Sequence, residues 1–130
     1  MVRTDAVIKY QWFQRCLWMD EQKSYTKEEV MTLAVEYITR NDEELYDVIK
    51  ASLIGGGKGK IAPTSKAYEK LSFRDMEVKQ FEAGEFIMPD LVHSKVVRAL
   101  KDWKTGNVDQ MQLIKTAKYG EPNLVPELVV

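Results

Sequence analysis

The sequence predicts an all-α protein, a small bundle of about five helices with a glycine-rich loop and an extended C-terminal arm. Two observations predict it. Apolar residues recur at spacings of three and four between Val7 and Trp103, and helix-capping residues stand in front of several of these stretches. The 130 residues have the size of one domain. We expect residues 1–121 to form a single domain and residues 122–130 to form an extended or flexible tail.

The composition restricts the classes of function. Hydrophobic residues make up 45% and charged residues 30%, which is the composition of a folded chain and not of a disordered one. With 19 basic and 20 acidic residues the net charge is −1, so any basic surface must come from segregation of charges. No stretch approaches the roughly 20 apolar residues that cross a membrane. The first residues lack a signal-peptide pattern, so we expect an intracellular protein without membrane contact.

The first predicted helix is apolar on two sides. One side carries Val7, Tyr10, Phe13, Leu17 and Trp18, and the other carries Ile8, Trp12 and Met19. A helix of this kind packs between neighbours or leaves one side for a partner. Burial of both sides is the interpretation that we favour.

The next two helices begin with capping signals. Thr26 and Glu29 form the pattern of a capping box, and an apolar stripe follows from Val30 to Ile38. Asn41 stands in front of three acidic residues, which favour the positive end of a helix dipole. Because the two helices meet near Arg40 and Asn41, we expect a helical hairpin.

The segment after the third helix cannot continue it. Four glycines within residues 55–59 predict a mobile loop. The loop does not fit a phosphate-binding motif, because Ile61 follows Lys60 and Ile54 occupies the place of the first glycine. A helix should then restart after Pro63, at Thr64 or Ser65, run to about Ala83 and stop at Gly84. Arg74 falls on its apolar side, where it needs a carboxylate, carbonyl oxygens or a partner.

The last third of the chain mixes extended and helical signals. Pro89 disfavours helix before it, so residues 85–91 should be extended. Ser94 could cap a last helix that ends at Trp103, with apolar and basic residues on opposite faces. Beyond it, Met111 and Leu113 alternate with polar residues, which favours a short strand or an extended arm.

Two segments are candidates for contact with RNA phosphates. Lysines cluster in and after the glycine-rich loop, and residues 95–118 hold six basic residues, Lys95 among them, against two acidic ones. The candidate RNA-binding residues are Lys58, Lys60, Lys66, Lys70, Arg98, Lys101, Lys104, Lys115 and Lys118. An ordinary solvated surface remains the alternative for both segments.

The sequence offers no catalytic or metal-binding pattern. His93 and Cys16 are the only histidine and cysteine, so the chain cannot form a usual zinc site. A catalytic triad would have to use His93, and no pattern of neighbouring residues supports that role. We therefore expect no enzyme activity, no cofactor, no metal and no small-molecule substrate.

Several segments together resemble the translation machinery-associated protein 16 family. They are QWFQ at residues 11–14, residues 25–27, residues 37–45, residues 74–91 and residues 100–103. The resemblance implies a small helical, noncatalytic factor that binds ribosomal RNA and proteins on precursors of the large ribosomal subunit, in the nucleus and nucleolus. It would be a monomer away from the ribosome. The partner-binding candidates are Trp12, Arg74, Phe86, Pro89 and Asp90.

The resemblance leaves alternatives open. The family carries a long basic N-terminal extension, whereas about ten residues precede Trp12 here, so we expect a short form without that extension. Such a protein could instead bind mature ribosomes in the cytoplasm, in dormancy or in translation. It could also be a helical protein-interaction module without RNA contact, using Ile8, Trp12 and Met19 or residues 86–88.

Overall fold

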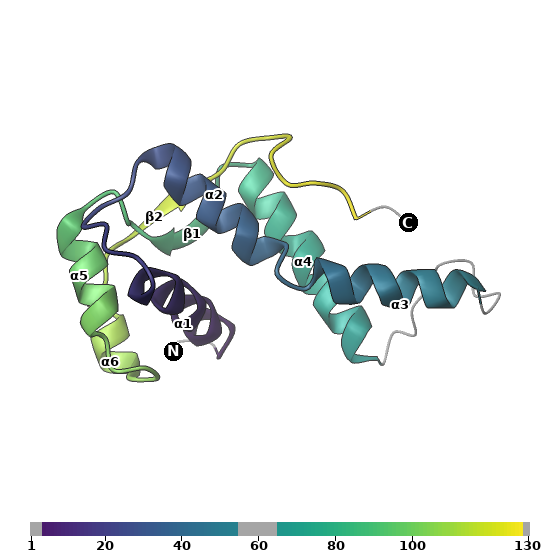
Figure 1. The fold of residues 1–130 in the computed structure, drawn as a ribbon, viewed down its shortest axis with the longest axis horizontal. Coiled ribbons are helices and arrows are strands. Elements are labelled where there is room, and N and C mark those ends of the chain that lie inside the picture. Colours follow the sequence, from purple (N-terminus) through teal and green to yellow (C-terminus); the bar gives the residue numbers. More distant parts are fainter. Residues whose placement is uncertain (1–3, 55–64, 129–130) are drawn as a thin grey trace.

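A computed structural model describes residues 4–54 and 65–128 of the chain. The elements in chain order are α1 (Thr4–Trp18), α2 (Lys27–Ile38), α3 (Asp42–Ile54), α4 (Lys66–Glu82), β1 (Phe86–Pro89), α5 (Ser94–Asp102), α6 (Val108–Met111) and β2 (Thr116–Tyr119). Figure 1 shows an elongated molecule with two regions. We call α1, α2, α5, α6, the sheet and the C-terminal half of α4 the body. We call α3 and the N-terminal half of α4 the arm.

Aromatic side chains from α1, α2, α4 and β1 form the centre of the body. The ring centroid of Phe13 lies 5.5 Å from that of Tyr37, and Phe86 lies 6.2 Å from both Tyr37 and Phe81. All four rings are buried. Their contacts join helices that are far apart in sequence, and such aromatic pairs contribute beyond the area that they bury.

A two-stranded antiparallel sheet makes the all-α prediction incomplete. Phe86 pairs with Tyr119 and Pro89 with Thr116. The predicted extended segment at residues 85–91 is confirmed, since it contains β1. The strand or arm predicted around Met111 and Leu113 is wrong. Asn107 accepts a hydrogen bond from the amide of Gln110 and starts the short helix α6, so β2 begins only at Thr116.

Gly120 allows β2 to end directly against α4. Its φ is +140°, and a Cβ atom there would lie 1.9 Å from the carbonyl oxygen of Phe81. Any other residue would force the strand and the helix apart, because that contact is with backbone and cannot move aside.

The predicted hairpin of the second and third helices is wrong. Figure 1 shows α3 leading away from α2, while α4 crosses α3 near its start. Two Arg74 nitrogens donate to the Asp42 carboxylate at 2.7 and 2.9 Å, and Lys70 lies 2.8 Å from Glu44. The acidic first turn of α3 therefore binds α4. Arg74 also donates to the carbonyl of Pro126 at 2.7 Å, so its carboxylate and carbonyl partners lie within the chain.

The other helical signals had mixed outcomes. The capping box of Thr26 and Glu29 is present, and α4 starts at the cap Ser65 and stops before Gly84, which has a φ of +72°. Ser94 is the first residue of α5 and not its cap, which is His93 without a side-chain hydrogen bond. The glycine-rich loop lies outside the described residues. Among the helices that the structure does describe, none is long and apolar enough to cross a membrane.

Candidate nucleic-acid interface

Helix α5 carries basic side chains outward because its apolar side is fixed on the body. Val96, Val97 and Leu100 are buried. The buried side-chain amide of Gln14, on α1, donates to the carbonyl oxygens of Leu100 at 2.9 Å and Trp103 at 2.7 Å. Carbonyls at the end of a helix need such partners. These bonds and the apolar contacts set the rotation of α5, so its opposite side faces solvent.

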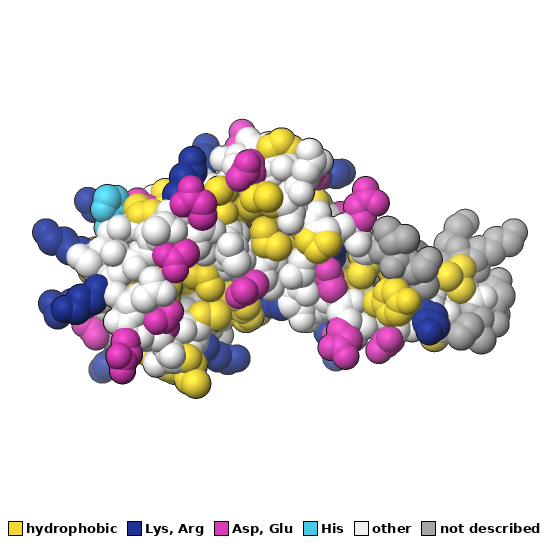
Figure 2. Space-filling model, turned by 45° about the horizontal axis from the view of Figure 1, so that its top comes forward, with side chains coloured by type: hydrophobic (Ala, Val, Ile, Leu, Met, Phe, Trp, Pro, Cys, Tyr) yellow, Lys and Arg dark blue, Asp and Glu magenta, His cyan; other side chains and the backbone are white. Residues whose placement is uncertain are grey.

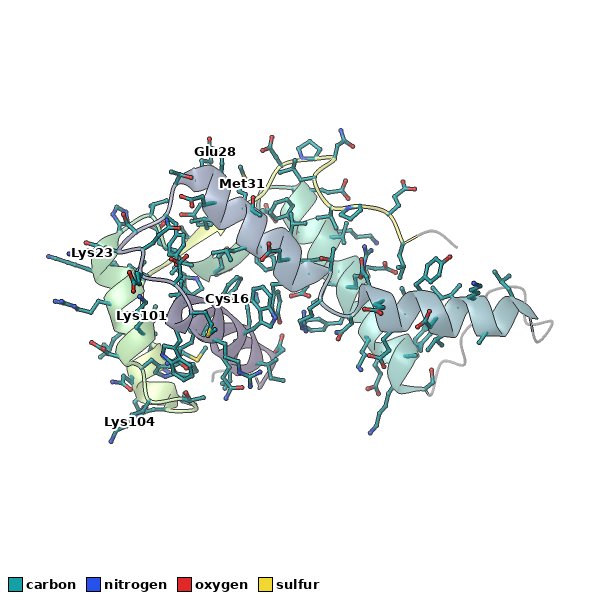
Figure 3. All side chains as sticks on the ribbon, in the orientation of Figure 1. Cys16, Lys23, Glu28, Met31, Lys101 and Lys104 are labelled. Atoms are coloured by element: carbon teal, nitrogen blue, oxygen red, sulfur yellow. The ribbon has the colours of Figure 1, made fainter. Side chains whose placement is uncertain are left out.

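A basic face lies over α5 and the loop after α1. We define it as Lys23, Lys95, Arg98, Lys101 and Lys104. Figure 2 shows Lys and Arg side chains gathered at this end of the molecule, and Figure 3 shows Lys23, Lys101 and Lys104 along α5. A groove between residues 21–23 and α5 is lined by the first four of these residues together with Glu21 and Asp102. Cations arranged in this way suit the backbone phosphates of RNA.

A second groove connects α5 to β2. Lys95 and Lys115 both line it, together with Asp90 and His93. Asp90 accepts hydrogen bonds from the Tyr119 hydroxyl and lies 3.3 Å from the His93 imidazole. Its backbone amide donates to the carbonyl of Lys115 at 3.0 Å. Lys115, directly before β2, therefore borders the basic face, whereas the exposed Lys118 lies within β2 and pairs with Ile87.

The structure separates the predicted RNA-binding residues. Arg98, Lys101 and Lys104 lie together on or beside α5, with Lys115 across a groove from Lys95. Lys66 and Lys70 lie on the N-terminal half of α4, in the arm, and Lys70 is paired with Glu44. Lys58 and Lys60 lie outside the described residues. Lys23 belongs to the basic face but was missed, because its place beside α5 depends on tertiary packing.

The five partner-binding candidates are mostly engaged within the body. Phe86 and Pro89 are buried, and Trp12 packs edge-on against Phe13 and Tyr37, with centroids 5.2 and 5.5 Å apart. Arg74 and Asp90 have the partners already named. Their role in binding a partner stays a prediction. Several apolar side chains are exposed instead: Ile8 and Trp18 on α1, Met19 directly after α1, and Ile87 on β1. The expected burial of both sides of α1 is therefore wrong.

A buried carboxyl group lies where the arm joins the body. Glu77 is 2% exposed, and its Oε2 has no hydrogen-bond partner among the described residues, nor has the Tyr37 hydroxyl. The nearest Arg40 nitrogen is 3.8 Å from Oε1. Burial raises the pKa of Glu77 to about 7, while Arg40 and Lys9 act in the opposite direction. Both Tyr37 and Glu77 line a cavity of about 230 Å³.

The sequence contained a signal for Glu77. It lies three positions after Arg74 and four before Phe81, which places all three on one side of a helix. The same spacing that singled out Arg74 would have identified Glu77. Lys9 gave no such signal. Its ammonium group lies 4.5 Å from the Phe86 ring centroid and donates to the Ile87 carbonyl, and burial lowers its pKa.

Comparison with known proteins gives two findings. A family model described as translation machinery-associated protein 16 matches residues 2–121. A zebrafish (Danio rerio) protein named translation machinery-associated protein 16 is 28% identical over 110 residues. That alignment covers 85% of this chain and 55% of the zebrafish protein, so the chain spans about half the length of that relative.

Proposed function

This chain belongs to the translation machinery-associated protein 16 family, and from that premise we propose that it is a noncatalytic factor that associates with the translation machinery. The family match confirms the resemblance carried by the separate sequence segments. The family is named for an association and not for a chemical reaction. Within the translation machinery, the target that we propose is the large ribosomal subunit or its precursor, in the nucleus and nucleolus.

The basic face is the observation that supports binding to ribosomal RNA. The chain has a net charge of −1, yet Lys23, Lys95, Arg98, Lys101 and Lys104 lie together at one end of the molecule. Apolar packing and the Gln14 hydrogen bonds hold α5 in place, so these cations need no large rearrangement to meet a polyanion. A fixed cluster of this kind supplies affinity for phosphates without reading a base sequence.

Purification from cells tests the proposed target. The tagged chain, isolated at moderate salt, should bring down precursors of large-subunit RNA and sediment with large-subunit particles. Recovery of mature ribosomes without precursors would instead indicate a function in dormancy or translation. Recovery of one protein partner, unaffected by nuclease or salt, would reject RNA binding in favour of a protein-interaction module.

Charge reversal tests the proposed surface. We expect Lys95→Glu, Arg98→Glu and Lys104→Glu together to weaken binding at least tenfold and to flatten its salt dependence, by about one unit of slope per lost phosphate contact. A matched control reverses three exposed lysines that do not belong to the basic face, Lys27→Glu, Lys50→Glu and Lys79→Glu. The control changes the net charge equally. Equal loss in both triple variants would show that total charge, and not this face, governs binding.

A further inference from the structure

We propose that Trp18 is a stacking platform for an unpaired base of RNA, at the edge of the basic face. The inference rests on the proposed contact with RNA. It goes further because it specifies single-stranded RNA and names a residue that contacts a base and not a phosphate.

Trp18 differs from the other tryptophans of the chain. Its side chain is 58% exposed, whereas Trp103 is buried and Trp12 packs between α1 and α2 against Phe13 and Tyr37. The next residue, Met19, is 90% exposed. An indole ring left largely in water has apolar area available for a ligand, and every base offers a ring face to stack on it.

A hydrogen bond holds the indole beside α5. The Nε1 group of Trp18 donates to the carbonyl oxygen of Lys101 across a long distance of 3.4 Å. This bond lies at the ring edge and occupies neither ring face. A second hydrogen bond joins the same two segments, since the ammonium group of Lys101 donates to the carbonyl of Asp20 at 3.0 Å. The end of α1 and the last turn of α5 therefore hold each other, and the indole is oriented before a ligand arrives.

The surrounding charge favours RNA over an apolar protein surface. Trp18 contacts the backbone of Lys101, which belongs to the basic face, and the exposed Arg15 lies one helical turn before it on α1. The carboxylate of the nearby Asp20 is directed at its own loop, where it accepts from the Gln22 amide and the Tyr25 hydroxyl. Phosphates on either side of a stacked base would meet these cations, as in proteins that bind single strands.

The ligand should be unpaired, because bases inside a duplex are already stacked on their neighbours. Duplex RNA is bound through its backbone and its shape, which the basic face alone could supply. Trp18 should therefore matter for single strands and not for duplexes. This difference separates a stacking residue from one that merely supports the fold.

Binding of the full chain to two labelled RNAs tests the inference. One is an unpaired strand of about 12 nucleotides, within the usual site sizes for single strands. The other is a duplex of the same length. Fluorescence anisotropy should show that Trp18→Ala weakens binding of the unpaired strand about 5- to 100-fold, with an unchanged salt slope and unchanged binding of the duplex. Trp18→Phe should retain most of the affinity. The matched control is Tyr68→Ala, which removes a partly exposed aromatic ring in the arm.

Each outcome decides between the inference and its premise. Wild-type affinity of Trp18→Ala for the unpaired strand, with the basic-face triple variant weakened, would overturn stacking and leave the RNA contact standing. Equal losses on strand and duplex would also overturn stacking. Failure of the wild-type chain to bind either RNA would reject the RNA contact itself, and Trp18 would then fit a protein partner. Thermal melts of each variant will confirm that this exposed substitution leaves the fold intact.

Discussion

The body and the arm are held together by different forces. In the body, rings from α1, α2, α4 and β1 meet in one buried cluster. The core cluster takes no side chain from α3 among the described residues, although Leu45 is buried. The arm depends on ion pairs instead, between Arg74 and Asp42 and between Lys70 and Glu44. Tyr46 and Leu53 of α3 remain partly exposed.

Because apolar burial holds the body and ion pairs hold the arm, the two regions should respond to different perturbations. Stabilisation from buried apolar area is not screened by salt, whereas exposed ion pairs weaken as salt screens them. Segments with few buried apolar contacts also open at a lower free energy than a packed core. We therefore expect α3 to open locally while the body stays folded.

The largest loss should come from the body. Phe13→Ala removes a fully buried ring that touches Trp12 and Tyr37, and it should lower the free energy of unfolding by about 3–5 kcal/mol. Urea denaturation measures this change. The control is Ile8→Ala on the same helix, where the side chain is half exposed and the loss should be below about 1 kcal/mol. Similar losses in both variants would contradict a core centred on Phe13.

Removing Arg74 should release the arm. Arg74→Met leaves Asp42 and the Pro126 carbonyl without their partner, and we expect a loss of about 2–4 kcal/mol. The loss should be local. In native-state hydrogen exchange, amides of α3 should exchange faster while those of α1 and α2 keep their rates. Equal acceleration in α1 would mean that body and arm unfold as one unit.

Glu77 should make stability depend on pH at the junction of the two regions. Burial raises its folded pKa to about 7 from a usual 4.5, so the unfolded chain releases this proton first. The protonated group stabilises the fold fully below about pH 4.5, and that stability is lost as pH rises through 7.

Glu77→Gln tests this dependence. Between pH 5 and pH 8 the wild-type chain should lose on the order of 2 kcal/mol of stability through this group, and the variant should lose correspondingly less. Urea denaturation at the two pH values compares them. Parallel pH profiles for the two proteins would show that Glu77 does not titrate in this range.

The smallest effect should come from the outer ion pair. Lys70→Ala removes the contact with Glu44, but both side chains are about half exposed, so the loss should be about 0.2–1 kcal/mol. Thermal unfolding at low salt should detect it. At about 1 M salt the difference from wild type should vanish, because the screening length falls to about 3 Å. A difference that persists would indicate lost packing of the lysine stem.

Local signals in the sequence predicted the elements that depend on local chemistry. The capping box at Thr26, the stop at Gly84 and the extended segment that contains Pro89 are each fixed by neighbouring residues. The sequence of β2 carries no comparable signal. Its residues form a strand because β1 lies beside them, and strand formation depends strongly on such neighbours.

In the candidate site, too, the sequence predicted the features that depend on local pattern and not those that depend on tertiary packing. The basic side of α5 follows from helical periodicity alone. The separation of Lys66 and Lys70 from that side depends on the direction in which α4 runs, which is a tertiary property. The exposure of Trp18 was missed for a related reason. Periodicity shows that α1 is apolar on two sides, but the number of neighbouring elements decides how much of it is covered.

The register of the sheet also orders events during synthesis of the chain. Pairing of Phe86 with Tyr119 closes a loop that contains α5 and α6. Ribosomes add residues from the N-terminus, at roughly 5–20 per second, so the whole of α1 to α4 exists before β2 does. The bonds from Asp90 to Lys115 and Tyr119 can form only after that. The loop that contains α5 and its basic side chains can therefore close on a nascent chain only after α1 to α4 have been made.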